Sequence, residues 1–200
     1  TFVISTLILA SVRMKDGSYS SQMRRVYDNV NNMSMLENFN SLSRRICAEK
    51  PDFDTAQQML RETKNKRIYS RWLTVLSSAL GAGSSAILFG GSWRDGLAGG
   101  IVGLVLGLLF LFKLENITAL AKTLIYSFIA GNISYLTVLA RIGENVDMVM
   151  IGSIMLLIPG LAFGNALRDL LCGDIMTGML KTVQSCLTAA LVACGYTGAM

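Results

Sequence analysis

The amino-acid sequence predicts an α-helical integral membrane protein with about five transmembrane helices and a small α+β cytosolic domain at its N-terminal end. Only 16% of the 200 residues are charged and 52% are apolar, whereas about a quarter of the residues of an ordinary soluble domain are charged. The charge is also uneven: residues 1–71 hold 12 of the 18 Lys and Arg residues and 7 of the 13 Asp and Glu residues, and residues 72–200 hold 6 of each. A basic aqueous head (residues 1–71) and a neutral membrane domain (residues 72–200) are therefore expected.

Five long runs without any charged residue indicate the membrane spans. The runs are residues 72–93, 96–112, 123–140, 148–167 and 182–200. Each is close to the roughly 20 residues that a helix needs to cross about 30 Å of hydrocarbon. One such run could be the core helix of a soluble protein, but five in succession indicate a membrane domain. We expect the spans at about residues 72–93, 95–112, 118–140, 147–167 and 174–199.

The head is predicted to begin with a β-hairpin over residues 1–27. Residues with a preference for strands precede Asp16-Gly17, which is a strong hairpin-turn signal, and a polar second arm follows from Tyr19 to Tyr27.

Two short helices are predicted to complete the head. Ser34 and Glu37 form a capping-box pattern at the start of a helix that reaches about Cys47. Its apolar stripe would contain Leu36, Phe39, Leu42 and Ile46. Pro51 ends this helix, and Asp54 is predicted to cap a second helix of about ten residues.

A basic collar joins the head to the first span and predicts the orientation of the chain. The collar consists of Lys64, Lys66, Arg67 and Arg71. Such a cluster can bind nucleic acid or anionic lipid. Because it lacks interleaved aromatic residues and precedes a span directly, we interpret it as a topogenic anchor that contacts membrane lipid and no nucleic acid. The head and the N-terminus would then be cytoplasmic, Arg94 and Arg141 would lie outside, and Lys113, Lys122 and Arg168 would lie inside.

Enzymatic and metal chemistry find little support in the composition. The chain has no His, and its four Cys residues form no C-x-x-C pair, which excludes a Cys–His zinc site and a triad with a His base. Asp169 and Asp174 are five residues apart across a Gly, so they do not share a helical face. We therefore predict no catalytic residue, no metal, no cofactor and no enzymatic activity.

Glycine residues give the second predicted span a surface that another helix can approach closely. They form the small-xxx-small pairs Gly96/Gly100, Gly99/Gly103 and Gly103/Gly107. Close packing is the favoured interpretation, and a helix that slides on its neighbour is the alternative.

The fourth predicted span contains Pro159-Gly160 near its middle. Proline removes a backbone donor and clashes with the preceding turn, so this helix should break and release carbonyl groups at membrane depth. Broken helices are a common way in which transporters build a binding site. A simple kink packed against a neighbouring helix is an equally open interpretation.

Polar residues follow this break and are the candidate substrate-binding or coupling residues. The complete candidate set is Pro159, Gly160, Asn165, Arg168, Asp169 and Asp174. An Arg168–Asp169 pair would lower the cost of placing charge near the membrane, and Arg168 is well shaped to bind a carboxylate. Asp169 is the candidate for proton coupling. Asp174 is expected to cap the fifth span, with a substrate or proton role as the alternative.

The segment from Pro159 to Asp174 resembles the P-G-x-x-x-T-N-x-x-R-D-x-x-x-G-D signature of threonine/serine exporter-like proteins. Gly164 stands where Thr is common in that signature. The segments Leu42-Ser43-Arg44-Arg45, Tyr69-Ser70-Arg71-Trp72 and Phe89-Gly90-Gly91-Ser92-Trp93 also resemble the family's amino-terminal half.

The resemblance implies a subunit or half of a proton-coupled secondary transporter in the bacterial cytoplasmic (inner) membrane. It would export threonine and serine, or a dicarboxylate such as succinate, together with a second multi-span subunit or homologous half. The alternative is a non-transporting membrane scaffold or an accessory subunit of a larger complex, whose function would survive neutral substitutions at Arg168 and Asp169.

Overall fold

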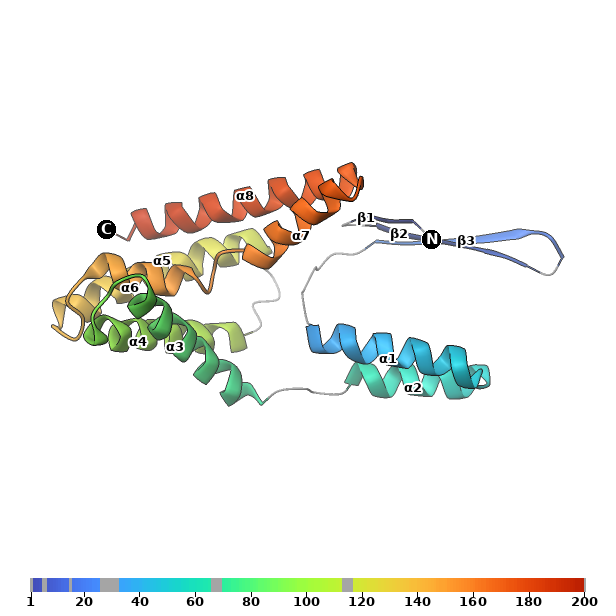
Figure 1. The fold of residues 1–200 in the computed structure, drawn as a ribbon, viewed down its shortest axis with the longest axis horizontal. Helices are drawn as coiled ribbons and strands as arrows, with labels where there is room; N and C mark the ends of the chain where they lie inside the picture. Colours follow the sequence, from blue (N-terminus) through green and yellow to red (C-terminus); the bar gives the residue numbers. More distant parts are fainter. Residues whose placement is uncertain are drawn as a thin grey trace. The chain divides into compact units, whose positions relative to one another are not determined.

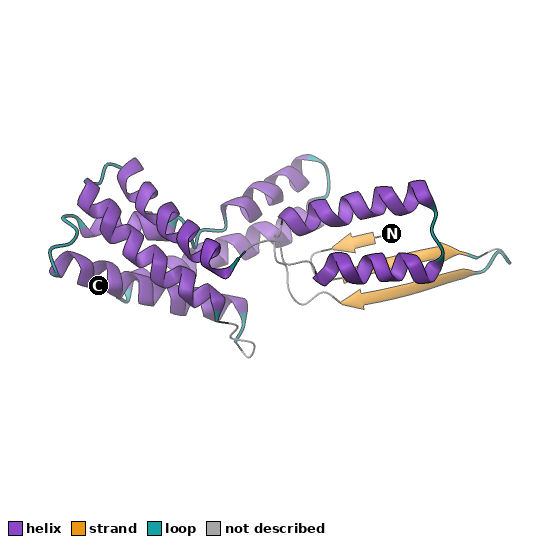
Figure 2. Cartoon of the chain, turned by 90° about the horizontal axis from the view of Figure 1, so that it is seen from below, coloured by secondary structure: helices purple, strands orange, loops and turns teal. Residues whose placement is uncertain are grey.

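The computed structural model describes residues 2–4, 7–14, 16–25, 33–65, 70–112 and 117–199. These residues are mostly helical, with strands only near the start of the chain (Figures 1 and 2). Residues 6–70 belong to one compact unit and residues 71–200 to another. Tyr27, Lys66, Arg67, Lys113 and Met200, which enter the sequence predictions, lie outside the described residues.

The predicted β-hairpin is confirmed. A short strand β1 (Phe2–Ile4) is followed by β2 (Leu7–Arg13) and β3 (Tyr19–Arg25). The last two pair antiparallel from Leu7 opposite Arg25 to Arg13 opposite Tyr19. Asp16 Oδ1 accepts hydrogen bonds from the backbone N–H of Ser18 at 3.0 Å and from its hydroxyl at 2.7 Å, and Gly17 takes a φ of 83°. The Asp-Gly turn therefore forms where the sequence places it.

The two helices of the head are also present, with different starts. The first helix, α1 (Met33–Glu49), already includes Ser34 in its first turn, so Ser34 is not the residue that precedes the helix. The second, α2 (Phe53–Asn65), begins one residue before Asp54. The predicted cap at Asp54 is therefore wrong, although a carboxylate in the first turn still favours the helix dipole.

The predicted apolar stripe of α1 is only partly buried. Leu42 is buried at 8% exposure, but Leu36 is 67% exposed. Among the described residues, α1 packs mainly against α2, and that contact covers only part of the stripe.

In the C-terminal unit, α3 (Arg71–Leu88) and α4 (Trp93–Leu111) pack closely through glycine. A β-carbon at Gly83 would lie 2.7 Å from the Gly96 carbonyl oxygen, and one at Gly103 would collide with the Ser78 carbonyl oxygen. A third helix, α6 (Val146–Ile154), joins them at Gly152, where a β-carbon would lie 2.5 Å from the Ala82 carbonyl oxygen. The prediction that the α4 glycines allow close helix packing is confirmed. The helix that packs against them belongs to this chain.

The remaining helices are α5 (Ala119–Leu139), α7 (Gly160–Leu171) and α8 (Ile175–Thr197). The long helix α8 packs against α5 and α7. The core lies between α4, α5, α6 and α8, and its buried residues are Ala98, Val102, Leu106, Tyr126, Ala130, Val149, Met150, Val192 and Tyr196. Within it, the Ser153 hydroxyl and the Tyr196 hydroxyl lie 2.7 Å apart in a buried hydrogen bond. This bond links α6 to α8.

Each predicted span corresponds to one helix, except that the fourth is divided between α6 and α7. Within the described residues, α4 and α8 are long and apolar enough to cross a membrane on their own. The α6 and α7 helices have 9 and 12 residues, so neither reaches across about 30 Å alone. The helical fold and the broken fourth helix are thus present, with two separate candidate spans.

Candidate functional site

The break in the fourth predicted span extends over five residues, from Met155 to Pro159, between the end of α6 and the start of α7. The Gly160 N–H donates a hydrogen bond to the Ile158 carbonyl oxygen, with 2.9 Å between nitrogen and oxygen. Within the described residues, no backbone N–H donates to the carbonyl groups of Met155, Leu156 or Leu157. The break therefore supplies free acceptors, and the start of α7 beside it supplies N–H donors.

One face of α7 is open. Pro159 is half-buried and occupies the position before the helix without a side-chain cap. A β-carbon at Gly160 or at Gly164 would meet no atom of the chain within 4 Å. These two glycines are four residues apart and lie on one stripe that continues to Arg168. Position 164, where the family signature has Thr, therefore has room for a β-carbon.

Asp169 of α7 takes a partner that the sequence analysis did not assign. Asp169 Oδ2 accepts a hydrogen bond from Lys181 Nζ of α8 at 2.7 Å, and the two side chains are 17% and 33% exposed. The expected Arg168–Asp169 pair is not formed. Arg168 is exposed and makes no ion pair within the described residues, although its charge acts on Asp169 from the neighbouring position.

A tight helical hairpin brings Asp169 and Lys181 together. Gly173 takes a φ of 90° and donates to the Leu170 carbonyl at 3.1 Å, while the Asp174 N–H donates to the Asp169 carbonyl at 2.9 Å. This pair of bonds is a Schellman motif, which ends a helix and turns the chain, and it favours Gly at the left-handed position. Figure 1 shows α7 and α8 side by side beyond this turn.

Gly178 sets the close approach of α8 to α7. A β-carbon there would lie 2.6 Å from Leu170 Cγ and 2.9 Å from the Leu170 backbone nitrogen. One residue earlier, Thr177 is 6% exposed, and its hydroxyl is buried without a hydrogen-bond partner in the described structure. Thr177 and Lys181 are four residues apart on α8 and share a face.

The side chains of the other two predicted site residues, Asn165 and Asp174, form no hydrogen bond or ion pair with Asp169 or Lys181 within the described residues. Asn165 is half-buried, one turn before Asp169, and its side chain makes no hydrogen bond within the described residues. Asp174 occupies the position before α8, as predicted, but its exposed side chain makes no capping hydrogen bond.

Asp95 is a second buried carboxylate that the sequence analysis missed. It is 2% exposed and accepts four hydrogen bonds. Oδ2 accepts from the N–H of Ser92 at 2.8 Å and from its hydroxyl at 3.0 Å, and Oδ1 accepts from the N–H groups of Glu144 at 2.7 Å and Asn145 at 2.8 Å. The Ser92-x-x-Asp95 spacing is a capping-box signal that could have indicated the local half of this network. All four acceptor positions are occupied, so Asp95 has a structural role.

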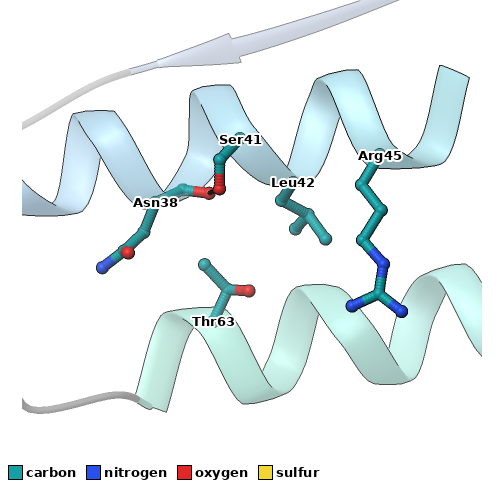
Figure 3. Close-up of a pocket in the computed structure, with 5 residues that line it drawn as sticks. All are labelled: Asn38, Ser41, Leu42, Arg45 and Thr63. Carbon is teal, nitrogen blue, oxygen red and sulfur yellow. Dashed lines mark hydrogen bonds between the residues drawn. The ribbon is translucent and has the colours of Figure 1, made fainter. Parts of the chain in front are cut away.

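A small groove lies between α1 and α2 in the head. It has a volume of about 160 Å³ and is lined by Asn38, Ser41, Leu42, Arg45 and Thr63. Figure 3 shows Leu42 and Arg45 of α1 and Thr63 of α2 pointing into the space between the two helices. Arg45 already donates to Glu49 at 3.0 Å, and both side chains are more than half exposed. The groove therefore offers no free buried charge.

Comparisons with known proteins agree with the signature in α7. The family model described as "Putative threonine/serine exporter" matches residues 1–200. A relative from Klebsiella aerogenes, named "Probable succinate transporter subunit YjjP", is 27% identical over 196 residues, which are 94% of this chain and 73% of that protein. No solved structure matches the chain. The match over the whole length confirms the resemblance seen in the sequence, and the chain belongs to the threonine/serine exporter family, which is a family of transporters and not of enzymes.

Proposed function

We propose that this chain is a subunit or half of a proton-coupled secondary transporter that exports small carboxylate-bearing metabolites. Threonine, serine and a dicarboxylate such as succinate are the candidate substrates. Family membership and the name of the Klebsiella relative support this proposal. The observation that carries it is the broken helix, whose second half, α7, bears Asp169 in a 2.7 Å ion pair with Lys181 of α8. Ionisable residues inside a membrane domain commonly mark transport pathways.

The proposed membrane arrangement has five spans, formed by α3, α4, α5, α6 with α7, and α8. The head, residues 1–71, would lie in the bacterial cytoplasm, and residues 72–200 would form the membrane domain. The excess of basic residues in the head supports this orientation, because cytoplasmic segments carry more Lys and Arg. The bonds from Asp95 to Glu144 and Asn145 support an up-and-down order, since they hold the α3–α4 and α5–α6 loops at one end.

The proposed site combines the break with the charged end of α7. Carbonyl groups released before Pro159 and Gly160 are suited to an ammonium group, and N–H groups at the start of α7 are suited to a carboxylate. Arg168 would attract the carboxylate, and Asn165 would hydrogen-bond a polar group of the substrate. Asp169 would carry the coupling proton, with Asp174 near the mouth of the site.

A second multi-span subunit or homologous half is part of the proposal. The relative's printed name describes a transporter subunit, and an odd number of spans in one chain fits half of a larger unit. The glycines of α4 contribute no support, because α3 of the same chain already packs against them.

An accessory, non-transporting role is the second candidate. It is favoured by one observation: Asp169 is already paired with Lys181, as a purely structural carboxylate would be.

An efflux assay tests the proposed function. The chain and a multi-span partner subunit of the same family would be reconstituted together in vesicles loaded with labelled threonine, serine or succinate. We expect efflux of at least one substrate, faster with a pH gradient than without it. Vesicles with the chain alone and protein-free vesicles are the controls. Efflux from the two-subunit vesicles that equals that from protein-free vesicles for all three substrates would refute the transporter and leave the accessory role.

A further inference from the structure

Lys181 is the one charged residue of α8, a helix of 23 described residues. Its side chain is two-thirds buried, and its ammonium group is neutralised by Asp169 of α7. A charge in a membrane helix is costly unless it is paired or hydrated. An apolar residue would pack in this helix at no such cost, so the position of Lys181 calls for a reason beyond packing.

Besides the Asp169–Lys181 ion pair, this part of α7 and α8 has a cation and a hydroxyl group without a partner in the described residues. Asp169 lies between two cations, because Arg168 precedes it and Lys181 bonds to it. Arg168 has no ion-pair partner in the described part of the chain. One turn before Lys181 on the same face, the buried hydroxyl of Thr177 has no hydrogen-bond partner. The cluster therefore has one unmatched positive charge and one unused hydroxyl.

We propose that Lys181 binds the substrate's carboxylate, and that Asp169 holds Lys181 in the absence of substrate. This inference rests on the proposed transport function and adds a binding residue that the family signature from Pro159 to Asp174 does not include. The shared chemistry is a carboxylate, which threonine, serine and succinate all carry.

The exchange follows from the geometry of the hairpin. A carboxylate first meets Arg168, which is exposed, and then replaces Asp169 Oδ2 as the acceptor of the Lys181 ammonium group. Thr177 donates its hydroxyl hydrogen to the same carboxylate. Because the Asp169–Lys181 bond joins α7 to α8, its replacement removes one link between these helices, while the packing of Gly178 against Leu170 remains.

Chemical rescue at position 181 tests this role. Cys47, Cys172, Cys186 and Cys194 are first replaced by Ser, and Lys181→Cys is added to this background. With the partner subunit present, we expect Lys181→Cys to lower efflux at least tenfold. Modification with an aminoethyl thiosulfonate restores a positive charge and should recover at least half of the rate, whereas a sulfonatoethyl reagent should recover none.

Substrate protection separates binding from a structural role. Saturating substrate should slow the reaction of the Lys181→Cys thiol with the aminoethyl reagent at least threefold. Lys122→Cys is the matched control, because Lys122 lies in the first turns of α5 and makes no ion pair among the described residues. Its thiol should react at the same rate with and without substrate.

A double variant covers the case in which Lys181→Cys does not insert. Asp169→Asn with Lys181→Met removes both charges together, so no unpaired charge opposes insertion. We expect this variant to reach the membrane at the normal level and to lose efflux.

The outcomes distinguish this inference from the proposed function. If the cysteine-free parent and its partner export none of the three substrates, the transport function fails. If the parent exports but either the Lys181→Cys or the double variant keeps the parental rate, or no substrate protects the thiol, Lys181 is structural and the transport function stands.

Discussion

The carboxylate of Asp95 accepts a hydrogen bond from the backbone N–H of Asn145 at 2.8 Å, across fifty residues of sequence. The same oxygen accepts from Glu144 at 2.7 Å, and the other oxygen is held by Ser92. Because Asp95 is 2% exposed, these donors replace the water that the carboxylate gives up. The contact fixes the start of α4 against the loop that leads into α6, and α6 leads to the break.

Asp95→Asn should therefore destabilise the protein. Its amide has one acceptor oxygen instead of two, so donors on one side are left buried without a partner, at a cost of roughly 1–3 kcal/mol. We expect a lower thermal unfolding temperature in detergent micelles. Glu144→Gln is the control, because the Arg94–Glu144 pair is 3.4 Å apart and about half exposed, and such pairs contribute about 0–1 kcal/mol. Equal unfolding temperatures for the two variants would contradict the role assigned to Asp95.

The orientation of the chain can be measured by cysteine labelling in intact cells. In a cysteine-free background, Ser18→Cys in the hairpin turn should react only after the membrane is made permeable, because the head is expected in the cytoplasm. Ile142→Cys, at an exposed position in the α5–α6 loop, should react from outside. Ser92→Cys is less suitable, since Ser92 bonds to Asp95. Labelling of Ser18→Cys from outside in intact cells would contradict the proposed orientation of the chain.

Gly178→Ala should separate α7 from α8. The added methyl group would lie 2.6 Å from Leu170 Cγ and 2.9 Å from the Leu170 nitrogen, and overpacking of this kind typically costs about 1–3 kcal/mol. We expect lower stability and at least tenfold slower efflux. Gly164→Thr is the control, because a β-carbon at position 164 meets no atom of the chain within 4 Å and Thr is common there in the family signature; it should keep the stability of the parent. The interpretation fails if Gly178→Ala is as stable as Gly164→Thr.

Arg168→Ala should abolish efflux while the protein still inserts in the membrane. Arg168 is exposed and makes no ion pair among the described residues, so its loss leaves no buried charge unpaired. The measurement compares the efflux rate with the amount of protein in the membrane fraction. Arg141→Ala, which removes an exposed cation from the α5–α6 loop, should keep the rate of the parent. If Arg168→Ala exports at the parental rate, Arg168 does not bind the substrate and the charged end of α7 has a structural role.

Asp169→Asn should weaken or remove the dependence of efflux on the pH gradient. The amide oxygen can still accept from Lys181, but the side chain can no longer exchange a proton. The ratio of efflux rates with and without the gradient is the measurement, and it should approach one. Asp147→Asn, an exposed carboxylate in the first turn of α6, should keep the ratio of the parent. An unchanged ratio in Asp169→Asn would place the coupling group elsewhere.

Asn165→Ala is expected to raise the apparent KM for the exported substrate. The side chain is half-buried and makes no hydrogen bond within the described residues, so its loss should leave the stability nearly unchanged. A fall in the unfolding temperature with an unchanged KM would instead indicate a packing role.

Local features of the fold followed from local sequence. The turn at Asp16-Gly17, the break before Gly160 and the start of the last helix after Asp174 all lie where the sequence predicted them. Each depends on the backbone preferences of a few adjacent residues, which a sequence displays directly. The exposed Leu36 shows the limit of this reasoning, because burial depends on what covers a helix face.

The sequence alone predicts the helical fold, the position of the break and the family signature. The packing of the helices is what pairs Asp169 with Lys181 of α8 and not with Arg168, its neighbour in sequence. It also places Asp95 against a loop fifty residues away and packs the α4 glycines against α3. Helical spacing predicts which residues share one face of a helix. Which other helix packs on that face depends on how closely the two helices can approach each other. Here the turn at Gly173 and the missing side chain at Gly178 bring α8 close enough for Lys181 to reach Asp169.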